Sequence, residues 1–175
     1  MIAEALRASS APGREPAAIL NKGLNGNRVN DLEARWTADV IEANPSVVTV
    51  LIGINDTWRR YDRGLRSPVP EFAASFDRIL TRAEEKRGPR LFVMTPFLFP
   101  VTTEQRTWFE DLSPRTEAVL RTAEAHGATV VRTDLALLRA AEEHGPAAVA
   151  PDGVHPSPLG HGVIAEAWLA AAMAV

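Results

Sequence analysis

The sequence predicts an α/β protein with three layers, in which a parallel sheet lies between two layers of helices. Strand-like and helix-like stretches alternate along the chain with no internal repeat or linker, and this order is typical of parallel sheets joined by helices. Residues 47–52 form an almost unbroken β-branched apolar run, which indicates a strand buried on both faces. Asn55 and Asp56 follow this run at once, where an open α/β sheet places its polar chemistry.

Length and composition indicate a single domain over residues 1–175, long enough to bury a sizeable core. The net charge of −3 gives no reason to expect nucleic acid or an anionic membrane as a partner. The absence of cysteine excludes a disulfide, a thiol nucleophile and a cysteine-ligated zinc. No apolar run is long enough to span a bilayer and no signal peptide is visible, so the chain as written predicts a cytoplasmic protein. Its oligomeric state stays unknown.

The first part of the chain contains two predicted helices and two predicted strands. Residues 1–10 have the period of a short amphipathic helix, and residues 17–21 form a short apolar strand. A longer helix is predicted over residues 27–44, where an Asn-Pro pair ends it before the apolar strand. Residues 58–70 follow that strand and are expected to form an irregular loop that holds four arginines.

The rest of the chain continues the alternation, which gives four predicted strands in all. Ser113 and Asp134 are expected to cap helices, because Ser and Asp side chains accept hydrogen bonds from the first turn. The remaining predicted strands are residues 91–95 and 128–132. The remaining predicted helices are residues 70–86, 104–111, 113–126, 134–144 and a last one that Ser157 caps.

Three polar stretches share the pattern of a known family. They are a Gly-Asn loop at residues 21–29, a G-x-N-D motif at residues 53–56 and a D-x-x-H motif at residues 152–155, in this order. Together they resemble the SGNH (GDSL-type) hydrolase family over nearly the whole chain. The resemblance implies a three-layer fold with a parallel, flavodoxin-like sheet, an ester-hydrolase activity, and no metal or cofactor.

One part of the family pattern is missing from this chain. The family opens with a Gly-Asp-Ser block on its first strand, and that serine is its nucleophile. This chain instead begins with a segment that resembles the helix after the block. By resemblance we expect the domain to be N-terminally truncated and to lack its first strand, which belongs in the interior of a five-stranded sheet. Because the N-terminus looks incomplete, secretion stays open.

His155 is the predicted general base, and Asp152 is its orienting partner. A separation of three residues in a tight loop lets the carboxylate reach one ring nitrogen while the other points into the site, and the carboxylate then stabilises the imidazolium. The alternative is a solvated histidine beside an Asp-Gly turn. The remaining histidines fit ordinary helix positions, since His126 and His144 precede glycines at helix ends and His161 lies early in the last helix.

The resemblance assigns the oxyanion hole to the backbone N–H of Gly26 and the side-chain amide of Asn55, with the N–H of the missing serine as a third donor. The position of Gly26 just before a helix agrees with this, because a helix N-terminus favours negative charge. Asn27 and Asp56 are candidates for holding these two loops in place. The alternative is a turn glycine at residue 26 and an Asn-Asp turn at residues 55 and 56.

Aromatic residues near these motifs predict a substrate rim. Trp58 and Tyr61, together with the nearby arginines, suit a sugar, although a solvated loop is an equal alternative. Phe97 and Phe99 either line an acyl pocket or cap the core.

No other serine is a good substitute for the nucleophile. Ser67, Ser113 and Ser157 could lie on the active face of the sheet. None of them has a strand-to-helix turn with flanking glycine that would project its hydroxyl.

The resemblance to this family implies a serine esterase for a small O-acyl ester, with acetylated carbohydrate favoured over long-chain lipid because no long apolar groove is evident in the sequence. Without its nucleophile, the chain as given is expected to be inactive. The first alternative is a non-catalytic remnant of the fold that binds a carbohydrate or a protein partner. The second is a metal-dependent hydrolase that uses Asp152, His155 and His161, whose spacing fits no established pattern.

Overall fold

The computed structural model describes residues 18–85 and 88–174, so the predicted helix at residues 1–10 lies outside the described residues. Three parallel strands form its sheet in the order β1-β2-β3. They are β1 (Val47–Leu51), β2 (Arg90–Met94) and β3 (Thr129–Val131). The predicted parallel α/β architecture is confirmed.

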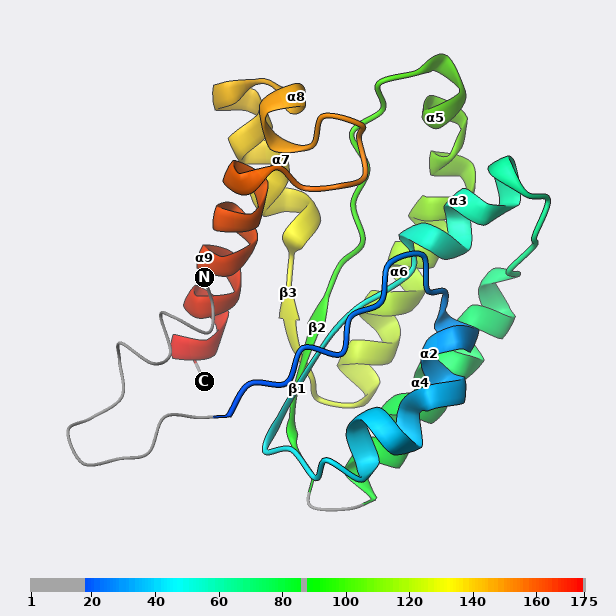
Figure 1. Cartoon of the computed structure of the whole chain (residues 1–175), viewed down its shortest axis with the longest axis vertical. Coiled ribbons are helices and arrows are strands. Elements are labelled where there is room, and N and C mark those ends of the chain that lie inside the picture. The colour runs from blue at the N-terminus through cyan, green and yellow to red at the C-terminus, as the bar shows by residue number, and fades with distance from the viewer. Residues whose placement is uncertain (1–17, 86–87, 175) are drawn as a thin grey trace.

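Helices cover both faces of this sheet. Figure 1 shows α2, α4 and α6 on one side of the strands and α7, α8 and α9 on the other. The helical segments are α2 (Val29–Trp36), its π-helical continuation η1 (Thr37–Ile41), α3 (Ile54–Asp62), α4 (Val69–Glu84), α5 (Thr103–Thr107), α6 (Phe109–Ala125), α7 (Thr133–His144), α8 (Pro146–Val149) and α9 (Pro158–Met173).

The two-residue period of the strands divides the core into two apolar clusters. Val50 and Val93 point to one face and pack with α2, α4 and α6. Phe92 and Val131 point to the other face and pack with α7, α8 and α9. Since successive side chains of a strand alternate between faces, both sides of β2 are buried, as a central strand requires.

The edge of the sheet at β1 differs from the sequence prediction. Residues 18–21 have no regular secondary structure, so the predicted strand at 17–21 is wrong for the residues that are described. β1 is buried on one face only, and Val47 and Leu51 on its other face are 40% and 42% exposed. Among the described strands β1 pairs with β2 alone, so its other edge has no hydrogen-bonded neighbour there.

Two helical segments also differ from prediction. The expected loop at residues 58–70 begins as helix α3, which starts directly after Gly53 and continues to Asp62. Helix α6 starts at Phe109 and carries Pro114 inside it, so Ser113 is not a cap. Pro114 is the sixth residue of α6, beyond the first turn, so its missing N–H costs the helix one backbone hydrogen bond. Asp134 likewise lies in the first turn of α7 and not at its cap.

The remaining predicted elements occur close to their expected positions. Ser157 caps α9 by accepting a hydrogen bond of 3.2 Å from the Gly160 N–H, as predicted. Across residues 18–85 and 88–174, no helix combines the length and the apolar character that crossing a membrane requires.

Candidate active site

A histidine and an aspartate form a hydrogen-bonded pair in the loop between α8 and α9. His155 Nδ1 lies 2.6 Å from Asp152 Oδ2, and Asp152 Oδ1 accepts hydrogen bonds from the backbone N–H groups of His155 and Val154. Partial burial would raise the pKa of Asp152, but these hydrogen bonds outweigh it and lower the pKa to about 2. Asp152 is therefore a carboxylate at neutral pH and can fix the orientation of the imidazole.

The backbone of this loop is held by the segment that follows β2. Gly153 has a φ of 86°, and a Cβ at this position would lie 2.2 Å from the carbonyl oxygen of Phe99. The Gly153 carbonyl accepts a hydrogen bond of 2.8 Å from the Phe99 N–H. Gln105 adds a second connection, because its Nε2 donates to the Asp152 carbonyl at 2.9 Å. Only glycine allows this close approach at residue 153.

The two predicted oxyanion donors lie on neighbouring helix N-termini. Asn55 is in the first turn of α3, and its Nδ2 donates to the carbonyl of Asn27 at 3.2 Å. An amide nitrogen carries two hydrogens, so one remains for an oxyanion. Gly26 precedes α2 with a φ of 81°, and its N–H has no acceptor within the described part of the chain. The structure thus brings the Gly-Asn loop and the G-x-N-D motif into contact.

Asp56 connects the same two helices from inside the protein. It is fully buried, and its carboxylate accepts hydrogen bonds from the Val29 N–H at 3.1 Å and from Ser67 Oγ at 2.8 Å. Burial raises the pKa of Asp56 despite these hydrogen bonds and the nearby Arg115 charge. Asp56 therefore links the start of α2 to the start of α3, which is the arrangement that its predicted function of holding the two loops requires.

An aromatic group lies beside His155. The Trp58 ring is 5.8 Å from the His155 ring, and 5.9 Å from the ring of Trp108. Tyr61 also stacks on Trp108, with their ring centroids 5.4 Å apart. The Arg59 guanidinium lies 4.8 Å from the Trp58 ring, and its Nη2 would be 3.9 Å from a Cβ on Gly26. Trp58 therefore lies beside His155, and Arg59 lies beside Trp58 and Gly26.

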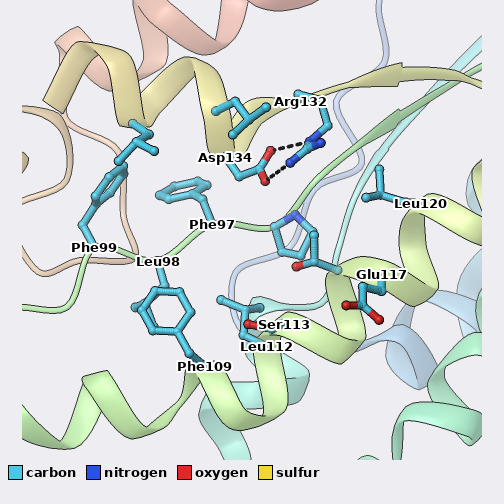
Figure 2. Close-up of a pocket in the computed structure, with 14 residues that line it drawn as sticks. Phe97, Leu98, Phe99, Phe109, Leu112, Ser113, Glu117, Leu120, Arg132 and Asp134 are labelled. Carbon is cyan, nitrogen blue, oxygen red and sulfur yellow. Dashed lines mark hydrogen bonds and ion pairs between the residues drawn. The ribbon is translucent and has the colours of Figure 1, made fainter. Parts of the chain in front are cut away.

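Phe97 and Phe99 belong to a different apolar cluster from Trp58, Tyr61 and Trp108. Both are at least nine-tenths buried and pack in the apolar cluster with α7 and α9. Figure 2 shows them lining a groove of about 350 Å³ between α6 and α7, with the ion pair of Arg132 and Asp134 on its wall. Of the two alternatives from the sequence, the structure supports packing in the core, and a substrate role for these rings stays a prediction.

The described serines have other partners than His155. Ser67 donates to the buried Asp56, Ser157 caps α9 and donates to the carbonyl of Ala148, and Ser113 lines the groove of Figure 2. Across residues 18–85 and 88–174, no three His, Asp or Glu side chains lie together as a metal site would require. The metal-dependent alternative with His161 is therefore not supported by the arrangement.

Several residues of the site were not predicted. Gln105 lies in α5 and contacts the Asp152 loop. Trp108, the residue after α5, is part of the aromatic group beside His155. Asp111 and Arg115 come from α6 and bind Thr57 in α3. The only local signal for the latter two is their spacing of four residues, which in a helix usually gives an exposed ion pair.

Comparison with known proteins places this chain in a family. A model of the GDSL-like lipase/acylhydrolase family matches residues 2–163. An acetylxylan esterase from Geobacillus stearothermophilus is 34% identical over 154 residues, which are 86% of this chain and 70% of that protein. A GDSL-like lipase structure from Parabacteroides merdae is 25% identical, with a TM-score of 0.82 over 86% of this chain and 71% of that one.

Structures of the Geobacillus acetylxylan esterase Axe2 also match. A catalytic mutant with a serine replaced by alanine is 34% identical, with a TM-score of 0.79 over 87% of this chain and 70% of that one. A catalytic mutant with an aspartate replaced by alanine is 33% identical, with the same TM-score and the same coverage.

Proposed function

Because the chain belongs to the GDSL-like lipase/acylhydrolase family, we propose that it is an esterase that removes acetyl groups from an acetylated carbohydrate. The substrate class rests on the similarity to an acetylxylan esterase. The contact that carries the proposal is the 2.6 Å hydrogen bond between His155 Nδ1 and Asp152 Oδ2. It leaves the other ring nitrogen without a partner among the described residues, as a general base requires.

In the proposed reaction, His155 Nε2 takes the proton from a serine hydroxyl while the serine oxygen attacks the ester carbonyl carbon. The Gly26 N–H and the Asn55 amide stabilise the oxyanion of the tetrahedral intermediate. The sugar oxygen leaves with the proton from His155, and the acetyl group stays on the serine. Water then attacks the acetyl-serine, His155 accepts a proton from that water, and acetate leaves as the serine regains its hydrogen.

We place the serine outside the described residues. Of the three serines that could face the site, Ser67 is hydrogen-bonded to Asp56 and Ser157 caps α9, while Ser113 lies in the groove between α6 and α7. The position that suits the nucleophile is a strand beside the open edge of β1, since its carboxyl end would lie next to Gly26 and Asn55. The chain as given is then inactive until that serine is supplied.

The test compares the 175-residue chain with a version extended by the codons that precede Met1 in frame. Both are assayed for hydrolysis of p-nitrophenyl acetate and of acetylated xylo-oligosaccharides, and both are treated with a fluorophosphonate that labels active serines. We expect turnover and a labelled Gly-Asp-Ser serine in the extended version only. His155→Ala should abolish the labelling, whereas His161→Ala, at an exposed histidine of α9, should leave it unchanged.

Failure has two recognisable forms. Labelling of Ser67, Ser113 or Ser157 in the short chain would show that the nucleophile is within it and that its placement here is wrong. Absence of turnover and of labelling in both versions would overturn the esterase proposal. Binding of the oligosaccharides without turnover, measured by calorimetry, would then favour a non-catalytic carbohydrate-binding remnant.

A further inference from the structure

Helix α6 buries an ion pair against the first turn of α3. Asp111 Oδ2 accepts hydrogen bonds of 2.7 Å from both Thr57 Oγ1 and Arg115 Nη2. Arg115 Nε donates to Thr57 Oγ1 at 3.2 Å, and Arg115 Nη2 also donates to the carbonyl of Ser67 at 2.8 Å. Arg115 and Thr57 have no exposed surface. The Thr57 hydroxyl is thus fixed as both donor and acceptor between two charged groups.

Thr57, which this ion pair holds, is two residues away from Asn55, the predicted oxyanion amide. Asn55, Asp56 and Thr57 are consecutive residues of the first turn of α3. Thr57 is held by α6, and Asp56 is held by the Val29 N–H at the start of α2. Within the described part of the chain, the Asn55 side chain has one hydrogen bond, of 3.2 Å to the Asn27 carbonyl. The neighbours of Asn55 therefore fix its position more firmly than its own side-chain contact does.

We propose that Arg115 and Asp111 are positioning residues that hold the first turn of α3, so that the Asn55 amide and the start of α2 keep the spacing of an oxyanion hole. The inference rests on the proposed esterase function. Neither residue touches the substrate. Their effect passes through Thr57 to the turn that carries Asn55.

Stability alone does not account for this pair. A buried ion pair loses hydration that its mutual attraction often fails to recover, and apolar side chains of similar volume can replace it at little or no cost. Arg115 Nη1 is buried and has no hydrogen-bond partner among the residues that the structure describes. Apolar groups would fill the same space, but they lack the directional hydrogen bonds that determine where Thr57 lies.

The test replaces the ion pair and the hydroxyl together with apolar groups, as Thr57→Val, Asp111→Leu and Arg115→Met in one protein. The matched control is Glu117→Leu with Arg121→Met, which removes an exposed pair of the same spacing from the same helix. Both are made in the full chain, in the version that the fluorophosphonate experiment finds active. Three quantities are measured: kinetics with p-nitrophenyl acetate, the melting temperature, and the hydrogen exchange rate of the Val29 amide.

We expect the triple variant to melt within about 5 °C of the control, because the two partners of the ion pair are removed together and Asp56 keeps its hydrogen bonds to Val29 and Ser67. Its kcat should fall by about 10- to 100-fold with KM within about twofold, since a displacement of about 1 Å or the loss of one oxyanion donor has effects of at least this size. Val29 exchange should rise by about tenfold or more, because Asp56 shares the loosened turn. The control should change none of the three.

Unchanged kcat and unchanged Val29 exchange in a folded triple variant would overturn the inference. A drop in kcat that follows the melting temperature, with faster exchange throughout α6, would show a merely structural role and would overturn it too. If the triple variant does not fold, Thr57→Val alone removes the hydroxyl that joins the ion pair to the first turn of α3, while the contact of Arg60 with Asp111 remains, and it is judged by the same measurements. If the unmodified protein has no esterase activity, the proposed function fails, and Val29 exchange still tests the positioning.

Discussion

Gly153→Ala tests whether the loop that carries His155 and Asp152 is held by the segment after β2. The native φ of 86° is unfavourable for alanine by about 1–2 kcal/mol. In addition, the new Cβ would lie 2.2 Å from the Phe99 carbonyl oxygen, so the loop must move by roughly 1 Å to reach an ordinary contact. That movement removes the hydrogen bond from Phe99 to Gly153, which contributes about 1 kcal/mol. The total loss is about 2–3 kcal/mol.

Gly145→Ala is the matched control, because Gly145 has a φ of 84° but no atom within 4 Å of an added Cβ. The two variants therefore both place alanine at a positive φ, and they differ in the contact with Phe99. With about 2–4 °C of melting temperature per kcal/mol, we expect Gly145→Ala to melt about 2–8 °C lower and Gly153→Ala about 4–12 °C lower. Esterase kcat should fall about 100-fold in Gly153→Ala only. Equal melting and equal kcat in the two variants would refute the reasoning.

Two further predictions concern Trp58 and Arg59, two residues of α3 beside the site. Trp58→Ala should raise KM for acetylated xylo-oligosaccharides more than it lowers kcat, as the loss of uniform binding does, and an unchanged KM in steady-state assays would remove Trp58 from the substrate rim. Arg59→Gln should weaken oligosaccharide binding by about 3- to 10-fold in calorimetry, a loss of about 1 kcal/mol as for one hydrogen bond. Arg63→Gln, which changes a 65% exposed side chain at the end of the same helix, should have no effect on this binding. Equal binding by the two variants would contradict a contact between Arg59 and the oligosaccharide.

Most strands and helices could be predicted because their signal is local. The apolar run at 47–52 and the helical period of Phe72, Phe76 and Leu80 are visible in neighbouring residues, and both elements occur as expected. The strand at 17–21 failed for the opposite reason. A short apolar stretch becomes a strand only with a hydrogen-bonding neighbour, and no described strand pairs with residues 18–21.

The chemistry of the site was partly visible in the sequence. His155 and Asp152 are three residues apart, so their contact depends on one tight loop. Helix α3 was missed because its apolar side chains, Trp58 and Tyr61, find their partner in Trp108, about 50 residues away. The contacts that Asp111 and Arg115 make with α3 are equally remote along the chain. Such pairings depend on how α3 and α6 pack, and no local period contains that information.

The pH dependence of stability provides a last test of the His155–Asp152 pair. The pKa of Asp152 is lowered from 3.8 to about 2 in the folded protein. The folded state therefore binds this proton less readily than the unfolded chain, so the pair adds stability above pH 3.8 and loses it as the pH falls toward 2. Asp152 and His155 are both about half exposed, which limits the effect to about 1 kcal/mol, or no more than about 4 °C in melting temperature.

Melting curves of the unmodified protein and of Asp152→Asn, recorded from pH 7 to pH 2, measure this contribution. We expect the difference to shrink between pH 4 and pH 2 as the native carboxylate is protonated. A difference that stays constant or grows between pH 4 and pH 2 would contradict the lowered pKa. The same reasoning applies to catalysis: because Asp152 stays ionised down to about pH 3, any loss of esterase activity at higher pH must come from the protonation of another group.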